Sequence, residues 1–283
     1  MKIGIFDSGL GGLSVLHHAK KVMPDAQFLY YADEAHVPYG EKTPEEIRGF
    51  VSEILHFFEE QQAKAVVIAC NTATSVADLE FRSRFAVPIV GMEPAVKRAV
   101  ELYGESGKRI LVAATPVTIA GQKLHGLLER VDHEHEADLI ALPGLVRLAE
   151  QGLFAAEEAD RYLEQALTGK DLSAYAAVVL GCTHFNYFKE NFRRIFPEQI
   201  AFVDGNEGTI RQLQRVLQDS AGKAEMAQTD PSERQSANPV SDQAAAGEAR
   251  GETVYFFSGK PVNREERARI DACMNRLEEM YML

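Results

Sequence analysis

Val66-Val-Ile-Ala-Cys-Asn-Thr-Ala-Thr74 begins as an apolar run and changes at Cys70 to small polar residues. Val178-Val-Leu-Gly-Cys-Thr-His184 repeats this arrangement, with Cys182 in the place of Cys70. A short apolar run of this kind is typical of a strand that is buried on both faces in a parallel sheet. Each stretch therefore predicts a buried strand with a thiol at its carboxyl end, followed by the first turn of a helix.

Predicted strands and helices alternate along the chain, and the alternation restarts near residue 109. The apolar segments predict strands at residues 2–6, 27–31, 65–69, 88–91, 109–113, 138–142, 175–180, 200–203 and 254–257. Helices are predicted at residues 13–21, 44–60, 72–84, 118–129, 144–151, 155–167, 186–196, 209–218 and 264–280, with Thr43 as the N-cap of the second. This alternation indicates an α/β fold with parallel sheets that are covered on both faces.

The length of 283 residues suggests two domains. We expect residues 1–96 and 209–283 to form the first α/β domain, because the last strand and helix are expected to return to it. Residues 97–208 are expected to form the second domain. Residues 220–252 contain no aromatic residue, Leu or Ile, so we expect a disordered insertion there.

Composition and charge exclude several classes of protein. The formal net charge of −12 argues against nucleic acid as a partner, because phosphates require clustered Lys and Arg. No apolar run is long enough to span a membrane. The N-terminus reaches Asp7 too early for a signal peptide, so a cytoplasmic location is expected. The odd count of three cysteines predicts free thiols.

The two thiols at strand ends are candidate functional groups. Parallel sheets bind ligands beyond the carboxyl ends of their strands, and Asn71-Thr72 or Thr183-His184 follows each thiol there. A lone free cysteine is more often a small core residue. Two cysteines in matching contexts with polar followers favour a function. Cys273 lies inside the last predicted helix without such neighbours and is expected to be structural.

Five segments in a fixed order carry a family resemblance: Asp7-Ser-Gly-Leu-Gly-Gly12, Pro38-Tyr-Gly40, Ala69-Cys-Asn-Thr-Ala-Thr74, Gly91-Met-Glu-Pro-Ala95 and Gly181-Cys-Thr-His184. Together they make the chain resemble the glutamate racemases of the cofactor-independent aspartate/glutamate racemase family. The resemblance runs over most of the chain, with residues 220–252 outside it.

The resemblance implies two pseudo-symmetric Rossmann- or flavodoxin-like domains with parallel sheets and an active site in the cleft between them. It implies interconversion of L- and D-glutamate without a cofactor and without a metal. Racemisation removes the α-proton from one face and returns a proton to the other, so each face needs a base. By resemblance, Cys70 and Cys182 are these two bases. The carbanion is then stabilised by exclusion of water and by hydrogen bonds to the carboxylate.

Further site residues are carried over from the matching motifs. Asp7 and His184 are implied to assist proton movement beside the two thiols. Glutamate is implied to contact Asp7, Ser8, Tyr39, Gly40, Asn71, Thr72, Thr183 and His184. Thr115 and Thr118 are additional candidates. Glu93 is expected to be a carboxylate in the first turn of a helix rather than a catalytic group.

Two segments depart from the family pattern. Phe185-Asn186 follows the second motif where Tyr-Pro is expected, and Gly205-Asn-Glu-Gly208 follows Asp204 where Ser and small residues are expected. Neither departure removes a proton-transfer group. The resemblance also implies a homodimer and the supply of D-glutamate for peptidoglycan synthesis. No activator site on an N-terminal extension is expected, because the first strand is predicted from residue 2.

A dinucleotide-binding oxidoreductase is the first alternative. Gly9-x-Gly11-x-x-Ser14 follows a predicted strand, and Asp33 ends the next one, which gives most parts of that fingerprint. Against it, Asp7 would repel a pyrophosphate, and Ser14 replaces the third glycine. An aspartate or other amino-acid racemase of the same family, and a non-catalytic amino-acid-binding protein, also remain open.

Two other classes of site fit less well. A metal site at Cys182-x-His184 lacks a second ligand pair at zinc-like spacing. The tract Asp132-His-Glu-His-Glu136 is expected to be a solvated loop. A cysteine hydrolase could use Cys182 and His184, but it would leave Cys70 without a role.

Overall fold

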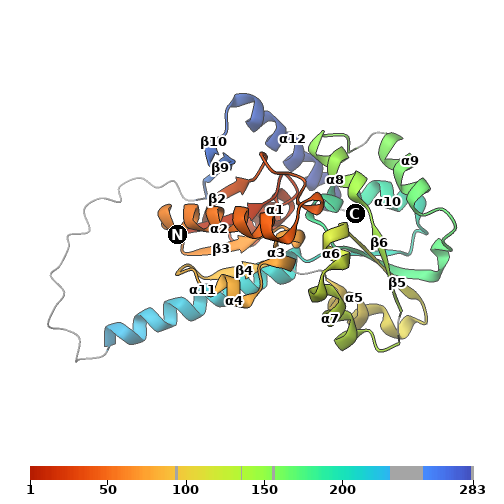
Figure 1. Cartoon of the computed structure of the whole chain (residues 1–283), viewed down its shortest axis with the longest axis horizontal. Helices are drawn as coiled ribbons and strands as arrows, with labels where there is room; N and C mark the ends of the chain where they lie inside the picture. Colours follow the sequence, from red (N-terminus) through yellow and green to blue (C-terminus); the bar gives the residue numbers. More distant parts are fainter. Residues whose placement is uncertain (93–94, 135, 155–156, 230–250, 282–283) are drawn as a thin grey trace.

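A computed structural model of the chain describes residues 1–92, 95–134, 136–154, 157–229 and 251–281. Its strands form two sheets that lie next to each other (Figure 1). The first sheet has six strands in the order β10-β9-β2-β1-β3-β4. They are β1 (Lys2–Asp7), β2 (Gln27–Ala32), β3 (Ala65–Ile68), β4 (Ile89–Gly91), β9 (Thr253–Phe257) and β10 (Lys260–Pro261).

The second sheet has four strands in the order β6-β5-β7-β8. They are β5 (Arg109–Ala114), β6 (Ala137–Ala141), β7 (Tyr175–Leu180) and β8 (Ala201–Val203). All pairs in both sheets are parallel except β9 with β10. The order β2-β1-β3-β4 in the first sheet matches β6-β5-β7-β8 in the second, so the expected pseudo-symmetric α/β fold with parallel sheets is confirmed.

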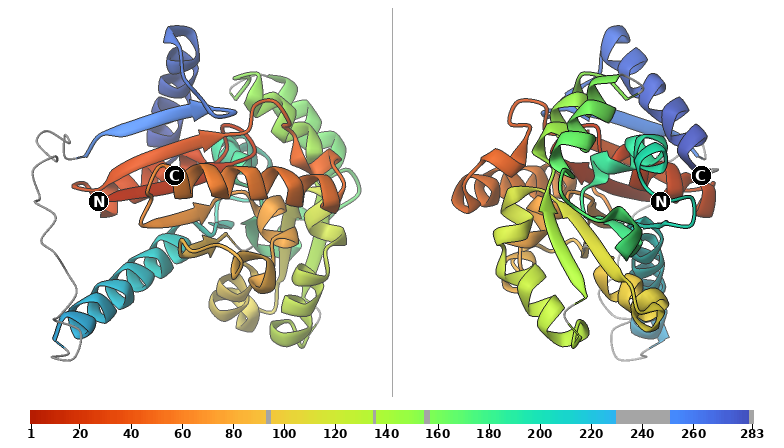
Figure 2. Two further views of the ribbon diagram at one scale, coloured as in Figure 1. Left: turned by 60° about the vertical axis from the view of Figure 1, so that its left-hand side comes forward. Right: turned by 90° about the vertical axis from the view of Figure 1, so that its right-hand side faces the viewer.

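Helices cover both faces of each sheet, as Figure 2 shows for the first. They are α1 (Leu13–Val22), α2 (Pro44–Glu60), α3 (Asn71–Val76), α4 (Leu79–Arg82), α5 (Val96–Tyr103), α6 (Pro116–Ala120), α7 (Gln122–Val131), α8 (Pro143–Glu150), α9 (Glu157–Ala166), α10 (Lys189–Ile195), α11 (Asn206–Thr229) and α12 (Arg264–Tyr281). Short 3-10 helices are η1 (Tyr39–Glu41), η2 (Gly104–Ser106), η3 (Leu172–Ala174) and η4 (Thr183–Phe188).

Side chains of the central strands alternate between the two faces of the sheet, which explains why helices cover both faces. In β3, Val67 faces a core that includes Leu13 and Leu16 of α1, whereas Val66 faces another that includes Phe58 of α2. The first of these cores continues into the second sheet, with Leu180 of β7 among its members. Since one core spans both sheets, the carboxyl ends of β3 and β7 are held in a fixed relation.

Helix boundaries follow local capping. The predicted helix at residues 44–60 is confirmed, and Thr43 forms a capping box with Glu46, which satisfies backbone N–H groups of the first turn. The predicted helix at residues 72–84 is wrong as a single element, because Asp78 caps a new helix, α4, by accepting from Phe81 N at 2.8 Å. The helix predicted at residues 118–129 likewise breaks at Gly121, between α6 and α7.

The C-terminal region differs from its prediction in part. The expected disordered insertion at residues 220–252 is wrong over its first part, because α11 continues to Thr229. Residues 230–250 lie outside the described residues, as do Glu93 and His135. After this gap β9 pairs with β2 of the first sheet, and α12 packs against α1. Among the described residues, no helix combines the length and apolar character that crossing a bilayer requires.

Candidate active site

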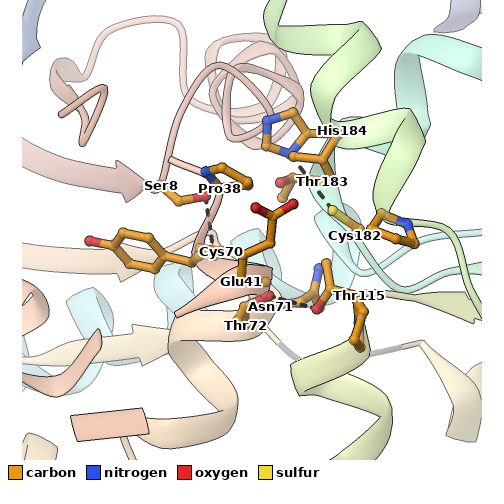
Figure 3. Close-up of a pocket in the computed structure, with 15 residues that line it drawn as sticks. Ser8, Pro38, Glu41, Cys70, Asn71, Thr72, Thr115, Cys182, Thr183 and His184 are labelled. Atoms are coloured by element: carbon orange, nitrogen blue, oxygen red, sulfur yellow. Dashed lines mark hydrogen bonds between the residues drawn. The ribbon is translucent and has the colours of Figure 1, made fainter. Parts of the chain in front are cut away.

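One pocket lies between the carboxyl ends of the two sheets, and both strand-end thiols line it (Figure 3). Ten of the residues proposed from the sequence line this pocket: Ser8, Tyr39, Gly40, Cys70, Asn71, Thr72, Thr115, Cys182, Thr183 and His184. Pro38, Glu41, Pro116, Pro143 and Val146 complete its wall. Asp7 lies directly behind the wall, where its Oδ1 accepts from Thr183 Oγ1 at 3.3 Å. Segments far apart in the sequence thus meet at one site.

Cys70 is the N-cap residue of α3 and is buried. Its sulfur accepts a hydrogen bond from Ala73 N at 3.4 Å and lies 3.6 Å from Ser8 Oγ. Burial, with the nearby Asp7 carboxylate, raises the pKa of the Cys70 thiol to about 12, although these two hydrogen bonds oppose the rise. Cys70 is therefore a neutral thiol near pH 7 in the unliganded protein.

Cys182 precedes η4 and has a different partner. Its sulfur lies 3.7 Å from His184 Nδ1, and His184 Nε2 lies 2.5 Å from Glu150 Oε1. Burial of His184 disfavours the charged imidazolium. The hydrogen bonds to Cys182 and Glu150 outweigh this effect and raise the pKa of His184 well above its usual value. The arrangement therefore places the His184 ring within reach of a proton on the Cys182 sulfur.

Asp7 ends β1 and is fully buried. Desolvation raises its pKa to about 6, although His184 and the backbone N–H groups of Gly12 and Gly9 act in the opposite direction. Near neutral pH the Asp7 carboxyl can therefore hold or release a proton beside both motifs.

Hydroxyl and amide groups supply the polar wall of the pocket. Thr72 Oγ1 lies 2.9 Å from Thr115 Oγ1, and Thr115 donates to Thr118 Oγ1 at 3.0 Å, which joins the two sheets below the pocket. Asn71 Oδ1 is buried and has no hydrogen-bond partner among the described residues. An orphaned buried acceptor costs free energy unless a ligand supplies a donor such as an ammonium group. None of the described residues that line the pocket is Lys or Arg.

Tyr39 contributes to the pocket wall without offering its hydroxyl. That hydroxyl donates to Asp33 Oδ2 at 2.6 Å, and His36 Nδ1 and Ser258 Oγ also contact the Asp33 carboxylate, at 2.9 and 3.2 Å. The buried Asp33 therefore anchors the segment that leads into η1. Tyr39 can contact a ligand through its ring or its backbone.

The glycine-rich loop is not arranged for a dinucleotide. Leu10 N donates to Glu150 Oε1 at 2.8 Å, and Gly9 N lies 3.4 Å from Asp7 Oδ2. Its N–H groups thus already face two carboxylates, which would repel a pyrophosphate. A Cβ on Gly11 would collide with the His184 ring, so a glycine is needed at this position, where the loop packs on that ring. The carboxylate of Asp33, which would have to bind a ribose, is taken by protein groups.

Two charged residues of the site, Glu150 and Glu41, were missing from the sequence prediction. Glu150, at the end of α8, holds His184, and no local pattern marks it because its role depends on how α8 packs against η4. Glu41 of η1 points into the pocket in Figure 3 and forms an ion pair with Arg147 of α8. The described residues contain no cluster of three or more His, Cys, Asp or Glu that could share a metal ion.

Comparisons with known proteins agree with this arrangement. A family model described as Asp/Glu/Hydantoin racemase matches residues 14–213. A glutamate racemase of Campylobacter curvus is 54% identical over 217 residues, 75% of this chain and 82% of that protein. A glutamate racemase of Halothermothrix orenii is 40% identical over 271 residues, 96% of this chain and 98% of that protein.

A solved structure extends the similarity to three dimensions. The Escherichia coli glutamate racemase, in complex with L-glutamate and the activator UDP-MurNAc-ala, matches with a TM-score of 0.69 and 32% identity over 77% of this chain and 82% of that chain. The chain therefore belongs to the Asp/Glu/Hydantoin racemase family, which confirms the resemblance and the enzyme class expected from its sequence, an amino-acid racemase.

Proposed function

We propose that the protein is a glutamate racemase that interconverts L- and D-glutamate, with Cys70 and Cys182 as the bases on opposite faces of the α-carbon. One observation carries the proposal: two thiols at the ends of equivalent strands line one pocket. The relatives named glutamate racemase support glutamate as the substrate.

The charges around the thiols suggest which one acts first. His184 faces the Cys182 sulfur at 3.7 Å, whereas burial keeps Cys70 a neutral thiol, so the proposed reaction starts from Cys182. The Cys182 thiolate removes the α-proton of one enantiomer and becomes a thiol. Cys70 then gives its proton to the opposite face of the carbanion and becomes a thiolate. The protein is left in the complementary protonation state, from which the reverse reaction starts.

The polar wall suits an amino acid whose carboxylates are held without Lys or Arg. Ser8, Thr72, Thr115 and Thr183 line the pocket. The Ser8 hydroxyl can donate to a substrate carboxylate, and the three threonine hydroxyls can do so by giving up the bonds they donate to neighbouring protein oxygens. Asn71 Oδ1 can accept from the substrate ammonium group. Burial of the site excludes water, which strengthens these hydrogen bonds as negative charge develops during proton removal.

The proposal also includes a homodimer in the cytoplasm that supplies D-glutamate for peptidoglycan synthesis. These parts are supported by the family resemblance. The alternatives of an aspartate racemase or a non-catalytic amino-acid-binding protein share the fold and differ in the reaction, so a measurement of the reaction separates them.

The first experiment is incubation with L-glutamate in D₂O, without added cofactor, followed by polarimetry and by NMR of the α-position. Loss of optical rotation with gain of α-deuterium is expected for L-glutamate, and no change is expected for L-aspartate. Racemisation of aspartate alone would replace glutamate by aspartate as the substrate. Binding of glutamate without exchange would show that the site is not catalytic.

A further inference from the structure

Arg269 of α12 joins the C-terminal helix to the His184 end of the site. Its Nη1 lies 3.3 Å from Glu34 Oε2, and its Nη2 lies 3.3 Å from the Glu150 carbonyl oxygen and 3.9 Å from Glu150 Oε2. Glu34 follows β2, and Glu150 ends α8, so one guanidinium bridges elements from both halves of the molecule. The side chain also lies over the Phe257 ring, with 5.7 Å between Cζ and the ring centroid.

Glu150 uses its two carboxylate oxygens differently. Oε1 contacts both Leu10 N and His184 Nε2. Oε2 is buried and has no hydrogen-bond partner among the described residues, and the cation that faces it is Arg269. A carboxylate with only 13% of its side chain exposed is costly to ionise without a nearby positive charge.

We propose that Arg269 is a positioning residue: its guanidinium holds the Glu150 carboxylate toward His184, and thereby controls the reactivity of the Cys182 sulfur that His184 faces. The inference rests on the proposed function, because that function gives the Cys182 sulfur its role. Arg269 does not line the pocket, so it acts through Glu150 and His184 rather than on the substrate.

The direction of the effect follows from the surrounding charges. Asp7, Glu34 and Glu150 are the carboxylates around the His184 end. Other titratable groups that interact with Glu150 are Tyr30, Tyr187 and Cys273. Removing the Arg269 charge makes the local potential more negative, which disfavours the Cys182 thiolate. Removing the Glu34 charge acts in the opposite direction. Arg269 is 39% exposed, so water and salt weaken its effect.

The test is alkylation of the full-length protein with iodoacetamide between pH 5 and 10, with the extent of labelling at Cys182 followed by peptide mass spectrometry. In Arg269→Met the pH midpoint of Cys182 labelling should rise by up to about one pH unit, because a partly exposed charge that acts through Glu150 and His184 has less effect than one in contact with the thiol. Arg269→Lys should restore most of the wild-type midpoint. Glu34→Gln should lower it. Arg267→Met is the matched control, since Arg267 lies on the same helix but pairs with Asp271.

Racemase kinetics supply a second readout. Because L- and D-glutamate have equal free energies, kcat/KM must fall equally in both directions, by about tenfold at neutral pH if the thiolate fraction falls by that factor. If Arg269→Met and Glu34→Gln shift the Cys182 midpoint in the same direction, or if neither folded variant shifts it, the proposal is wrong. Labelling does not require turnover, so a wild-type protein that fails to racemise glutamate would contradict the proposed function and still leave this test valid.

Discussion

The strand ends at Cys70 and Cys182 occupy equivalent positions in the two sheets, and yet their thiols have unlike surroundings. β3 and β7 each lie beside the central strand of their sheet and run parallel to it. Cys70 caps α3 through its sulfur, whereas Cys182 makes no cap hydrogen bond and faces His184. The comparison shows that a repeated backbone position fixes where a thiol lies, while the residues that follow it decide which groups the thiol contacts.

The unlike surroundings match what a two-base racemisation needs. If both thiols were equally buried and without a charged partner, both would stay protonated and no base would be available. If both lay beside a histidine, no acid would face the thiolate. The structure instead pairs a thiol whose pKa is raised to about 12 with a sulfur next to His184. The three predictions below test this difference.

The largest effect is expected from removing either thiol. Cys70→Ala and Cys182→Ala should each lower racemisation by at least about 10³-fold, because each removes a proton-transfer group. In D₂O, Cys70→Ala keeps the Cys182 sulfur beside His184 and should exchange the α-proton of only one enantiomer, whereas Cys182→Ala keeps only the neutral Cys70 thiol and should exchange neither. Chiral chromatography and NMR of the α-position would measure both quantities.

Cys273→Ala is the matched control for the two thiol variants. Cys273 is buried in α12 and does not line the pocket. Its replacement should leave turnover within about twofold of wild type and cost about 1 kcal/mol of stability, as is usual for a small buried side chain. Full racemisation by Cys70→Ala or Cys182→Ala would disprove the two-base mechanism, and an inactive but folded Cys273→Ala would show that α12 has a catalytic role.

A smaller loss of racemase activity is expected from His184→Gln, because this change keeps a polar group and removes the positive charge. The value of kcat/KM should fall by about 10²-fold. The pH midpoint of Cys182 labelling by iodoacetamide should rise, while Cys70 should still react only in strongly alkaline solution. Equal shifts at both thiols would contradict the assignment of His184 to Cys182 alone.

The smallest effect concerns stability at Asp7, on the Cys70 side of the site. Burial raises the pKa of Asp7 from 3.8 to about 6, so its stabilising contribution is complete below pH 3.8 and is lost as pH rises through 6. About two pKa units correspond to roughly 3 kcal/mol. Asp7→Asn should therefore raise the free energy of unfolding at pH 8 by up to this amount, and by little at pH 4, as measured by urea denaturation.

Asp138→Asn provides a control of opposite sign. The hydrogen bond from Arg109 lowers the pKa of Asp138, so the stability from this carboxylate is present above its usual pKa and is lost as pH falls. This variant should be destabilised at pH 8. If Asp7→Asn raises the free energy of unfolding by the same amount at pH 4 and pH 8, burial of the Asp7 charge is not the cause of that increase.

Local sequence predicted the parts of the fold that local physics controls. The strand before each thiol follows from apolar runs, and α2 follows from its amphipathic pattern and the Thr43 cap. Sequence reasoning failed where a single residue interrupts a pattern, as at Asp78 between α3 and α4. It also failed for α11, whose polar composition beyond residue 219 suggested a loose segment although the helix continues to Thr229.

The sequence by itself determined that two thiols end two equivalent strands, because apolar runs, small polar followers and family motifs are all local features. Only the tertiary structure decided that Glu150 holds His184, that Arg269 faces Glu150, and that Asp7 lies behind Thr183. These pairs join residues far apart in the chain, and their energies depend on burial and on distances that only packing fixes. The same cause gives the two thiols unlike surroundings, because desolvation and neighbouring charges act through space rather than along the sequence.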